Sequence, residues 1–167
     1  MVRRLKRDVL TQLPPKSRHT VWLELTQRNL VDVNADFKIW RELNKTIYTL
    51  PSGSEEQRLL IFERKKIISQ LFRKTAIAKC QAITKWVMGA LSEGRSFIFF
   101  GYHRVVLDAV QEAVSNADIP FMRIDGSTPS HVRQQNVENF QKDSTIRIAI
   151  LSLMAAGTGV TLTRVSE

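Results

Sequence analysis

Cysteine is almost missing from this chain, whose 167 residues include Cys80 and no second thiol. Cys80 cannot form an internal disulfide, and with His19, His103 and His131 it has no metal-ligand spacing, which argues against a disulfide scaffold and a zinc site. The 7 glycines and 5 prolines are too few for a disordered or fibrous chain. No apolar run approaches the roughly 20 residues of a membrane span, and residues 1–6 lead into no apolar signal segment. We therefore expect a globular, metal-free protein of a reducing intracellular compartment, without membrane contact.

Acidic residues are also scarce in the first half of the chain. Residues 1–80 hold 17 Lys/Arg and 8 Asp/Glu, a balance of +9, whereas residues 81–167 hold 8 of each. The excess lies in two clusters, at 3–18 and at 58–79. A basic surface attracts phosphate polyanions and releases their counterions, so nucleic acid is the leading partner class. Solvated helix faces that bind nothing would have the same composition, and charge alone leaves both interpretations open.

Residues 1–95 are expected to form a mostly helical, basic segment. The alternating pattern of 19–25 predicts a short strand. Apolar residues at three- and four-residue steps predict a helix through 33–47, and a break follows at 49–57. In that break, a capping box can start the next helix at Ser52…Glu55 or at Ser54…Gln57.

Two further helical faces follow that break. The first is marked by Leu60, Ile67 and Leu71, and the second runs over 83–91 and ends at Gly94. Three tryptophans fall at apolar periodic positions, which predicts core side chains rather than base-stacking surfaces: Trp22, Trp40 and Trp86.

From residue 96 the pattern changes to strand–helix alternation. Apolar runs at 96–100, 120–124 and 146–153 predict three strands, joined by helices of about a dozen residues. This order indicates an α/β fold, a parallel sheet flanked by helices, over 96–167. Ligands of such sheets bind at the carboxyl ends of the strands, where three loops of interest lie: 101–103, 125–128 and 155–159.

Each of these loops has a functional and a plain structural interpretation. The Ser127 and Thr128 hydroxyls stand beside the predicted helix start at Pro129, which suits a backbone phosphate, although Thr128 is equally an ordinary helix cap. Asp125 argues against a bare anion pocket and can brace the turn through its own loop amides. Gly157 and Gly159 permit an anion cradle of backbone amides, or merely a tight turn that leaves the strand.

A complete catalytic set is missing from the sequence. No Gly-Lys pair occurs, so there is no P-loop, and no nucleophile elbow or zinc-protease motif is found. Asp108 and Glu112, one helical turn apart, are expected on a solvated face, and His103 at a strand end is more often structural. Residue chemistry alone therefore predicts a domain with phosphate-binding loops and no chemistry of its own.

Several stretches taken together are more specific than any one of them. Residues 1–18, 97–110, 122–143 and 147–163 resemble successive motifs of the second motor lobe of SWI/SNF-type superfamily-2 ATPases, in the same order and spacing. The segments "RIDGSTPS", "AILSLMAAGTGVTLT" and "FRKTAIAK" (72–79) are most similar to the annealing-helicase branch of this family. Such proteins use ATP to rewind DNA and remodel stalled replication forks, so the resemblance implies a RecA-like lobe and a nuclear protein.

The resemblance also implies roles for individual residues. Those expected to bind the DNA backbone are Gly101, His103, Gly126, Ser127, Thr128, Arg133, Ser152 and Ala155. Those expected to line the nucleotide cleft are Gly157, Thr158 and Gly159. The run Arg3 to Lys6, with Leu13 to Lys16, matches the start of the lobe.

Other parts of the motor are expected outside this sequence. The P-loop and the magnesium-binding acids belong to the first lobe, and the arginines of motif VI would follow Glu167. ATP and Mg²⁺ would thus be bound mainly by those parts, and we expect negligible ATPase activity from this fragment alone. The expected partners are DNA, forked DNA in particular, and the first lobe of the same protein. The alternative is a stand-alone doubly wound domain that binds phosphate or a protein without catalysis.

Overall fold

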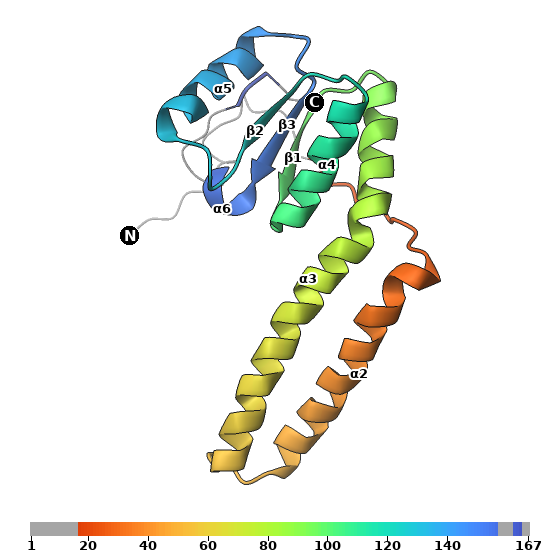
Figure 1. Ribbon diagram of the computed structural model, residues 1–167, viewed down its shortest axis with the longest axis vertical. Helices are drawn as coiled ribbons and strands as arrows, with labels where there is room; N and C mark the ends of the chain where they lie inside the picture. Colours follow the sequence, from red (N-terminus) through yellow and green to blue (C-terminus); the bar gives the residue numbers. More distant parts are fainter. Residues whose placement is uncertain (1–16, 157–161, 165–167) are drawn as a thin grey trace.

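The computed structural model describes residues 17–156 and 162–164, and its outline is that of a long helical hairpin projecting from an α/β lobe (Figure 1). Helices α2 (Gln27–Thr49) and α3 (Glu55–Ser92) form the hairpin. The lobe follows in the order β1 (Phe97–Gly101), α4 (Arg104–Asn116), β2 (Phe121–Ile124), α5 (Ser130–Lys142), β3 (Ile148–Ser152) and the short α6 (Leu153–Ala156).

The hairpin turn confirms one of the two capping boxes that the sequence allowed. Ser54 Oγ accepts a hydrogen bond from Gln57 N at 3.2 Å, and Gln57 Oε1 accepts from Gly53 N at 2.8 Å. Gly53 has a φ of +81°, a backbone conformation that residues with a Cβ rarely adopt. The turn thereby reverses the chain and starts α3 at Glu55.

Polar contacts fix the pairing of the two hairpin helices. Lys74 Nζ lies 2.7 Å from Asp36 Oδ2, and Arg64 Nη1 donates to Asn44 Oδ1 at 3.2 Å. Near the lobe, Asn29 Nδ2 donates to the carbonyl of Ala78 at 3.4 Å. These contacts are spread along α3, so α2 covers one side of α3 and leaves its other sides to the lobe and to solvent.

The three strands form a parallel sheet in the order β1–β3–β2, as predicted for this part of the chain. β3 is central, and all five of its residues are buried. Its position explains why 148–152 is a continuous apolar run, because helices cover both faces of the sheet.

Two packed layers enclose this sheet. On one face, the end of α3 and helix α4 pack on β3 through Val87, Leu91, Leu107, Val110, Val114, Ile148 and Ile150. On the other, α5 places Phe140 against Met122, Ile124, Ala149 and Leu151. The flanked parallel sheet confirms the predicted α/β fold with a helical portion before it. The boundary at residue 95 stays a prediction about domains, and residues on both sides of it contribute to the first of these layers.

The sequence predicted separate helices over 60–71 and 83–91, and the structure corrects this. α3 is one helix of 38 residues from the hairpin tip to the core. Between the two stripes, Ala76 and Ala78 are buried, and alanine favours helix, so nothing interrupts it. The predicted end at Gly94 is confirmed: Gly94 has a φ of +82°, and Arg95 N donates to the carbonyl of Ala90 at 3.2 Å, as in a Schellman motif.

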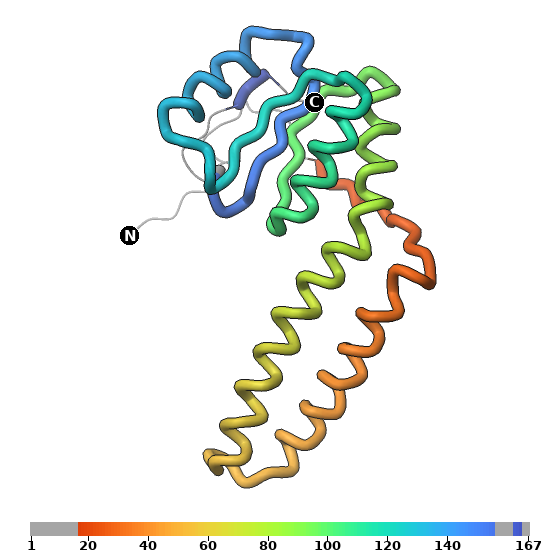
Figure 2. The backbone as a smooth tube through the Cα atoms, in the orientation of Figure 1, coloured from red at the N-terminus to blue at the C-terminus, as the bar shows by residue number. Residues whose placement is uncertain are grey.

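The prediction of a strand at 19–25 was wrong. Residues 17–26 are neither strand nor helix, and Figure 2 shows them as an extended tube running beside α3. A strand requires a neighbour for its backbone hydrogen bonds, and β1, β2 and β3 pair with one another only. The alternation of apolar and polar residues at 19–25 thus corresponds to an extended segment that has no hydrogen-bonded neighbouring strand.

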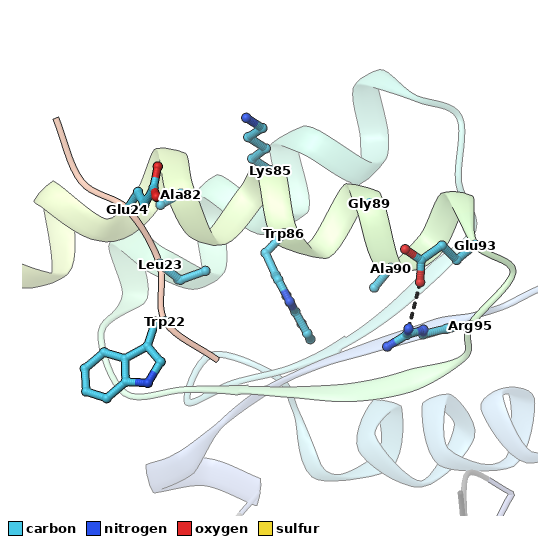
Figure 3. Close-up of a pocket in the computed structure, with 10 residues that line it drawn as sticks. All are labelled: Trp22, Leu23, Glu24, Ala82, Lys85, Trp86, Gly89, Ala90, Glu93 and Arg95. Atoms are coloured by element: carbon cyan, nitrogen blue, oxygen red, sulfur yellow. Dashed lines mark ion pairs between the residues drawn. The ribbon is translucent and has the colours of Figure 1, made fainter. Parts of the chain in front are cut away.

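The prediction of core tryptophans was wrong for two of the three. Trp22 is 89% exposed and Trp86 is 40% exposed, and both line a hollow of about 370 Å³ between 22–24 and α3 (Figure 3). Trp86 meets the ring of Phe97 edge-on at 6.0 Å. Trp40 is half-buried in the hairpin and stacks on Phe37 at 5.5 Å.

Candidate nucleic-acid interface

The carboxyl ends of the three strands meet at one edge of the sheet, which we call the rim. A cavity of about 240 Å³ lies there, and its lining comes from the loops after β1 and β2, the start of α4 and the end of β3: Tyr102, Arg104, Leu107, Asp125, Gly126, Ser127 and Ser152. Parallel strands place their carboxyl ends together, which is why loops far apart in sequence converge. Two of the three predicted loops, 101–103 and 125–128, are therefore neighbours.

Gly101 ends β1 at a point where no side chain fits. A Cβ built on Gly101 would lie 2.7 Å from Leu107 Cδ2 and 3.3 Å from Leu107 Cγ, and Leu107 is fully buried. The requirement here is space and not an unusual φ. Gly101 thus lets α4 pack tightly on β1 and sets the position of the loop that follows.

Asp125 organises the loop after β2. Its Oδ1 accepts from Ser127 N at 2.9 Å and from Ser127 Oγ at 2.6 Å, while its own N–H donates to Thr128 Oγ1 at 3.0 Å. These bonds from Ser127, with the Arg123 guanidinium, hold the pKa of Asp125 at about 2, although burial acts in the opposite direction. The bracing role that the sequence allowed for Asp125 is confirmed.

Arg123 connects this loop to α4. Its Nη2 lies 2.7 Å from Asp125 Oδ2 and 2.7 Å from Asp108 Oδ1, and its Nη1 donates to Gln111 Oε1 at 2.7 Å. Burial alone would lower the pKa of Arg123, but the hydrogen bonds to Asp108 and Asp125 raise it. Asp108, expected on a merely solvated face, is instead part of this network, and its other neighbour is Arg104 at 3.7 Å.

The hydroxyls of the loop are not equivalent. The Ser127 hydroxyl donates its hydrogen bond to Asp125 Oδ1. The Thr128 hydroxyl accepts a hydrogen bond from Asp125 N and donates to no group among the described residues. The Gly126 N–H likewise has no partner among them. Gly126 is exposed, and no atom lies within 4 Å of a Cβ built on it.

Two helices begin at the rim without a side-chain cap. α4 starts after His103 and α5 after Pro129, and neither of these residues caps its helix with a side chain. The prediction that Thr128 caps α5 was wrong, because its hydroxyl instead accepts from Asp125 N. The first N–H groups of both helices therefore lack intrahelical partners and carry the positive end of the helix dipole.

Arg133 lies on α5 with its guanidinium turned back to the loop. Its Nε donates to the carbonyl of Thr128 at 2.8 Å, its Nη2 to that of Asp125 at 3.2 Å, and its Nη1 to that of Ala155 at 3.0 Å. One side chain thus ties the loop after β2 to the turn after β3. The role in DNA binding expected for Arg133 remains a prediction, and three of its five N–H groups are engaged by the protein.

The remaining predicted residues are distributed as follows. Ser152 is buried at the rim, and Ala155 is half-buried in α6, where its carbonyl meets Arg133. His103 is half-buried and its ring contacts that of Tyr102 edge-on at 5.0 Å. The residues predicted for the nucleotide cleft, Gly157, Thr158 and Gly159, lie outside the described residues. Positions 3–16 of the basic cluster at 3–18 also lie outside them.

Sequence reasoning gave no individual role to several residues of the rim, although one of them, Tyr102, lies in the predicted loop 101–103. Tyr102 is 63% exposed beside the cavity, and Arg104 lines it from the first turn of α4. Both follow β1 directly, so their place at a strand end was the available signal. Arg123 had no such signal, because Asp108 is 15 positions away in the sequence. Arg164 was also missed: it donates to the carbonyls of Phe140, Asp143, Ser144 and Ile146 and closes the end of α5.

The hollow of Figure 3 is a weaker candidate for an anion site. Its cations Lys85 and Arg95 stand beside Glu24 and Glu93, and Arg95 Nη2 lies 2.8 Å from Glu93 Oε2. Charges of opposite sign are therefore balanced there, whereas the rim adds two uncapped helix starts to its arginines. Phosphate chemistry favours the rim.

Two general searches complete the inventory of the described residues, 17–156 and 162–164. They contain no group of three His, Cys, Asp or Glu side chains placed to hold a metal ion. None of their helices is both long and apolar enough to cross a lipid bilayer.

Comparison with solved structures supports the fold. The C-terminal part of the Fun30 ATPase domain matches 92% of this chain and 73% of its own length with a TM-score of 0.62 and 20% identity. The C-terminal domain of the Sulfolobus solfataricus SWI2/SNF2 ATPase matches 87% and 67%, with a TM-score of 0.61 and 17% identity. Both likenesses extend over most of the chain and are likenesses of fold.

Sequence comparison identifies the family. Residues 78–166 match the helicase conserved C-terminal domain. The chain is 39% identical over 164 residues to DNA annealing helicase and endonuclease ZRANB3 of Bos taurus, which covers 98% of this chain and 14% of that relative. It is 37% identical over 164 residues to SWI/SNF-related matrix-associated actin-dependent regulator of chromatin subfamily A-like protein 1 of Drosophila melanogaster, covering 98% and 20%. The chain thus spans a small part of these relatives; it belongs to the helicase conserved C-terminal domain family, and its fold is that of a second RecA-like lobe.

Proposed function

We propose that this lobe binds the phosphate backbone of one DNA strand at its rim, as half of an ATP-driven DNA translocase. The carrying observation is the convergence of the loops after β1 and β2 with the end of β3 on one cavity, beside two helix starts without side-chain caps. Backbone N–H groups at helix starts are favourable partners for phosphate, and they read no base sequence. The proposed contact is thus one that a motor can make at every step along DNA.

Three kinds of donor at the loop after β2 would hold a phosphate. They are the N–H of Gly126, the hydroxyl of Thr128 and the first N–H groups of α5. Ser127 acts differently: its proton holds Asp125, so it positions the loop rather than the DNA. Arg133 also positions, since it binds Thr128 and Asp125 through their carbonyls.

The full-length protein is proposed to rewind or remodel DNA, with forks as the preferred substrate, in the nucleus. ATP with Mg²⁺ would supply the phosphoryl-transfer energy, bound mainly by the first lobe and by motif VI. In this lobe we assign Gly157, Thr158 and Gly159 to the nucleotide cleft. The expected inactivity of this fragment alone is tested by an ATPase assay with and without DNA.

The test is a fluorescence anisotropy titration of the 167-residue chain with forked DNA at several salt concentrations. Binding should weaken steeply with salt, because phosphate contacts release counterions. Thr128→Ala should weaken binding about five- to tenfold, and Thr128→Ser, which keeps the hydroxyl, should restore it. Thr46→Ala, at an exposed position on α2, is the matched control and should bind like the native chain.

Gly126→Ala separates the proposed contact from the fold. No atom lies within 4 Å of the added Cβ and Gly126 has no positive φ, so the variant should keep its melting temperature. A methyl group at this position would nevertheless obstruct a phosphate approaching the N–H. Binding that is unaffected by both Gly126→Ala and Thr128→Ala, or binding that does not change with salt, would contradict the proposal.

A further inference from the structure

Helix α3 presents one face along its whole length, and that face changes character halfway. Positions 58, 62, 65, 69, 72, 76, 80, 83, 87 and 91 follow one another at steps of three or four residues, the spacing of a single helix face. In the second half of this face, Ala76 is buried, and Val87 and Leu91 are buried against the lobe. In the first half, which we call the outer α3 face, every residue is exposed: Arg58, Phe62, Lys65, Ser69 and Phe72.

The outer α3 face combines large aromatic rings with positive charge. Phe62 is 73% exposed and Phe72 is 65% exposed, and neither ring stacks on another aromatic ring of the described residues. Lys65 lies between them, Lys66 follows Phe62 by one helical turn, and Arg73 directly follows Phe72 in the sequence. None of these three cations takes part in an ion pair within the described part of the chain.

The part of α3 that carries this face has far more basic than acidic residues. Residues 58–73 contain five basic side chains and one acidic one, Glu63. Of the five, Arg64 turns toward α2, where it binds Asn44. The remaining four, Arg58 included, leave a strongly positive surface that favours a polyanion.

The outer α3 face ends about two helical turns before α3 meets the start of α4. Cys80 of α3 lies 3.9 Å from the carbonyl of Val105, in the first turn of α4. Arg73 precedes Cys80 by two helical turns, about 10 Å along the axis. Figure 1 shows the hairpin extending from the lobe on the side of the strands' carboxyl ends, which is the side of the rim.

We infer that the outer α3 face binds single-stranded nucleic acid, as a continuation of the rim. Exposed aromatic rings between cations suit an unpaired strand, because its bases stack on the rings while its phosphates meet the cations. A duplex keeps its bases stacked inside, so it would use the cations alone. From Arg58 to Arg73 the face measures about 22 Å, enough for several nucleotides.

This inference deepens the proposed function and rests on it for the identity of the polymer. The test measures binding of the complete 167-residue chain to a 20-nucleotide oligothymidylate and to a blunt duplex of the same length. The double variant Phe62→Ala/Phe72→Ala should bind the oligothymidylate about tenfold more weakly and the duplex almost unchanged. Lys65→Gln should lower the slope of log affinity against log salt by about 0.7 for the single strand.

Matched controls come from α2. Tyr48→Ala removes a ring that is 82% exposed, and Lys38→Gln removes an exposed charge from the side of α2 turned away from α3. Both should bind oligothymidylate like the native chain. All four variants alter exposed side chains, so their melting temperatures should agree within a few degrees.

Three results would overturn the inference. The first is native oligothymidylate affinity in the double phenylalanine variant. The second is an equal loss of duplex and single-strand binding in that variant, which would leave no role for stacking. The third is competition by polyglutamate as strong as that by unlabelled oligothymidylate, which would make an acidic peptide the ligand.

The rim variants distinguish this inference from the proposed function. Thr128→Ala should weaken duplex and single-strand binding alike, whereas the α3 variants should affect the single strand. If Thr128→Ala and Gly126→Ala bind normally while the phenylalanine variant fails on oligothymidylate, the rim proposal falls and the outer α3 face remains a single-strand site.

Discussion

Replacing Asp125 by asparagine should destabilise the protein in a pH-dependent manner. The native carboxylate accepts two bonds from Ser127 and two from Arg123, and its pKa is about 2 instead of 3.8. A carboxyl whose pKa is lowered by folding contributes stability above its unfolded pKa and loses it as the pH falls toward its folded pKa. The difference of about 1.8 units corresponds to about 2 kcal/mol at neutral pH, and the side chain is nearly buried, so little of this is screened.

The assay is urea unfolding of the native chain and of Asp125→Asn at pH 7 and at pH 2.5. The native chain should be more stable by about 2 kcal/mol at pH 7 and by about 1 kcal/mol at pH 2.5, because most of the linkage is lost between pH 4 and 2. Asp32→Asn is the control: Asp32 is exposed and forms no ion pair within the described residues. An equal difference between the native chain and Asp125→Asn at both pH values would refute the reasoning.

Three further predictions concern the backbone and its bracing. Gly101→Ala should lower stability by about 1–3 kcal/mol in urea unfolding, because its Cβ meets Leu107 Cδ2 at 2.7 Å; no loss would mean that Leu107 moves freely. Gly94→Ala should lower stability by about 1 kcal/mol because its φ is +82°, whereas Gly89→Ala, inside α3 with open space, should raise it by about 0.5–1 kcal/mol; equal effects would contradict this assignment. Arg133→Lys should speed amide hydrogen exchange at Ser127 and Thr128 at least tenfold, since a lysine cannot hold three carbonyls at once; unchanged exchange would remove its bracing role.

The sheet was predictable because its signals are local. Strands buried on both faces are continuous apolar runs, and 148–152, fully buried, is the clearest of them. Their alternation with helices then restricts the topology to a parallel sheet, which predicts that 101–103 and 125–128 lie at one edge. The hairpin turn was also local, since Ser54 and Gln57 are three residues apart.

The errors came from properties that depend on distant parts of the chain. The alternation of 19–25 has no neighbouring strand to pair with, and the burial of Trp22 depended on a layer that the described residues do not provide. Periodicity indicated that Trp86 has an apolar side but not that this side lies at the edge of the core.

Hydrogen-bond assignments in the site could not be derived from sequence either. Ser127 and Thr128 are adjacent hydroxyl residues with the same apparent chemistry. Only the geometry shows that the Ser127 hydroxyl donates a hydrogen bond to Asp125, whereas the Thr128 hydroxyl accepts one from the backbone N–H of Asp125. The pairing of Arg123 with Asp108 likewise depends on how α4 lies against β2.

The continuity of α3 has a mechanical consequence. At 1.5 Å per residue, its 38 residues make a rod of about 57 Å with no glycine at a positive φ and no proline inside it. One end carries the hairpin turn, and the other is clamped by Val87 and Leu91 beneath the central strand. Because the helix is continuous from the tip to the core, a lateral load on the tip is transmitted along α3 to the sheet.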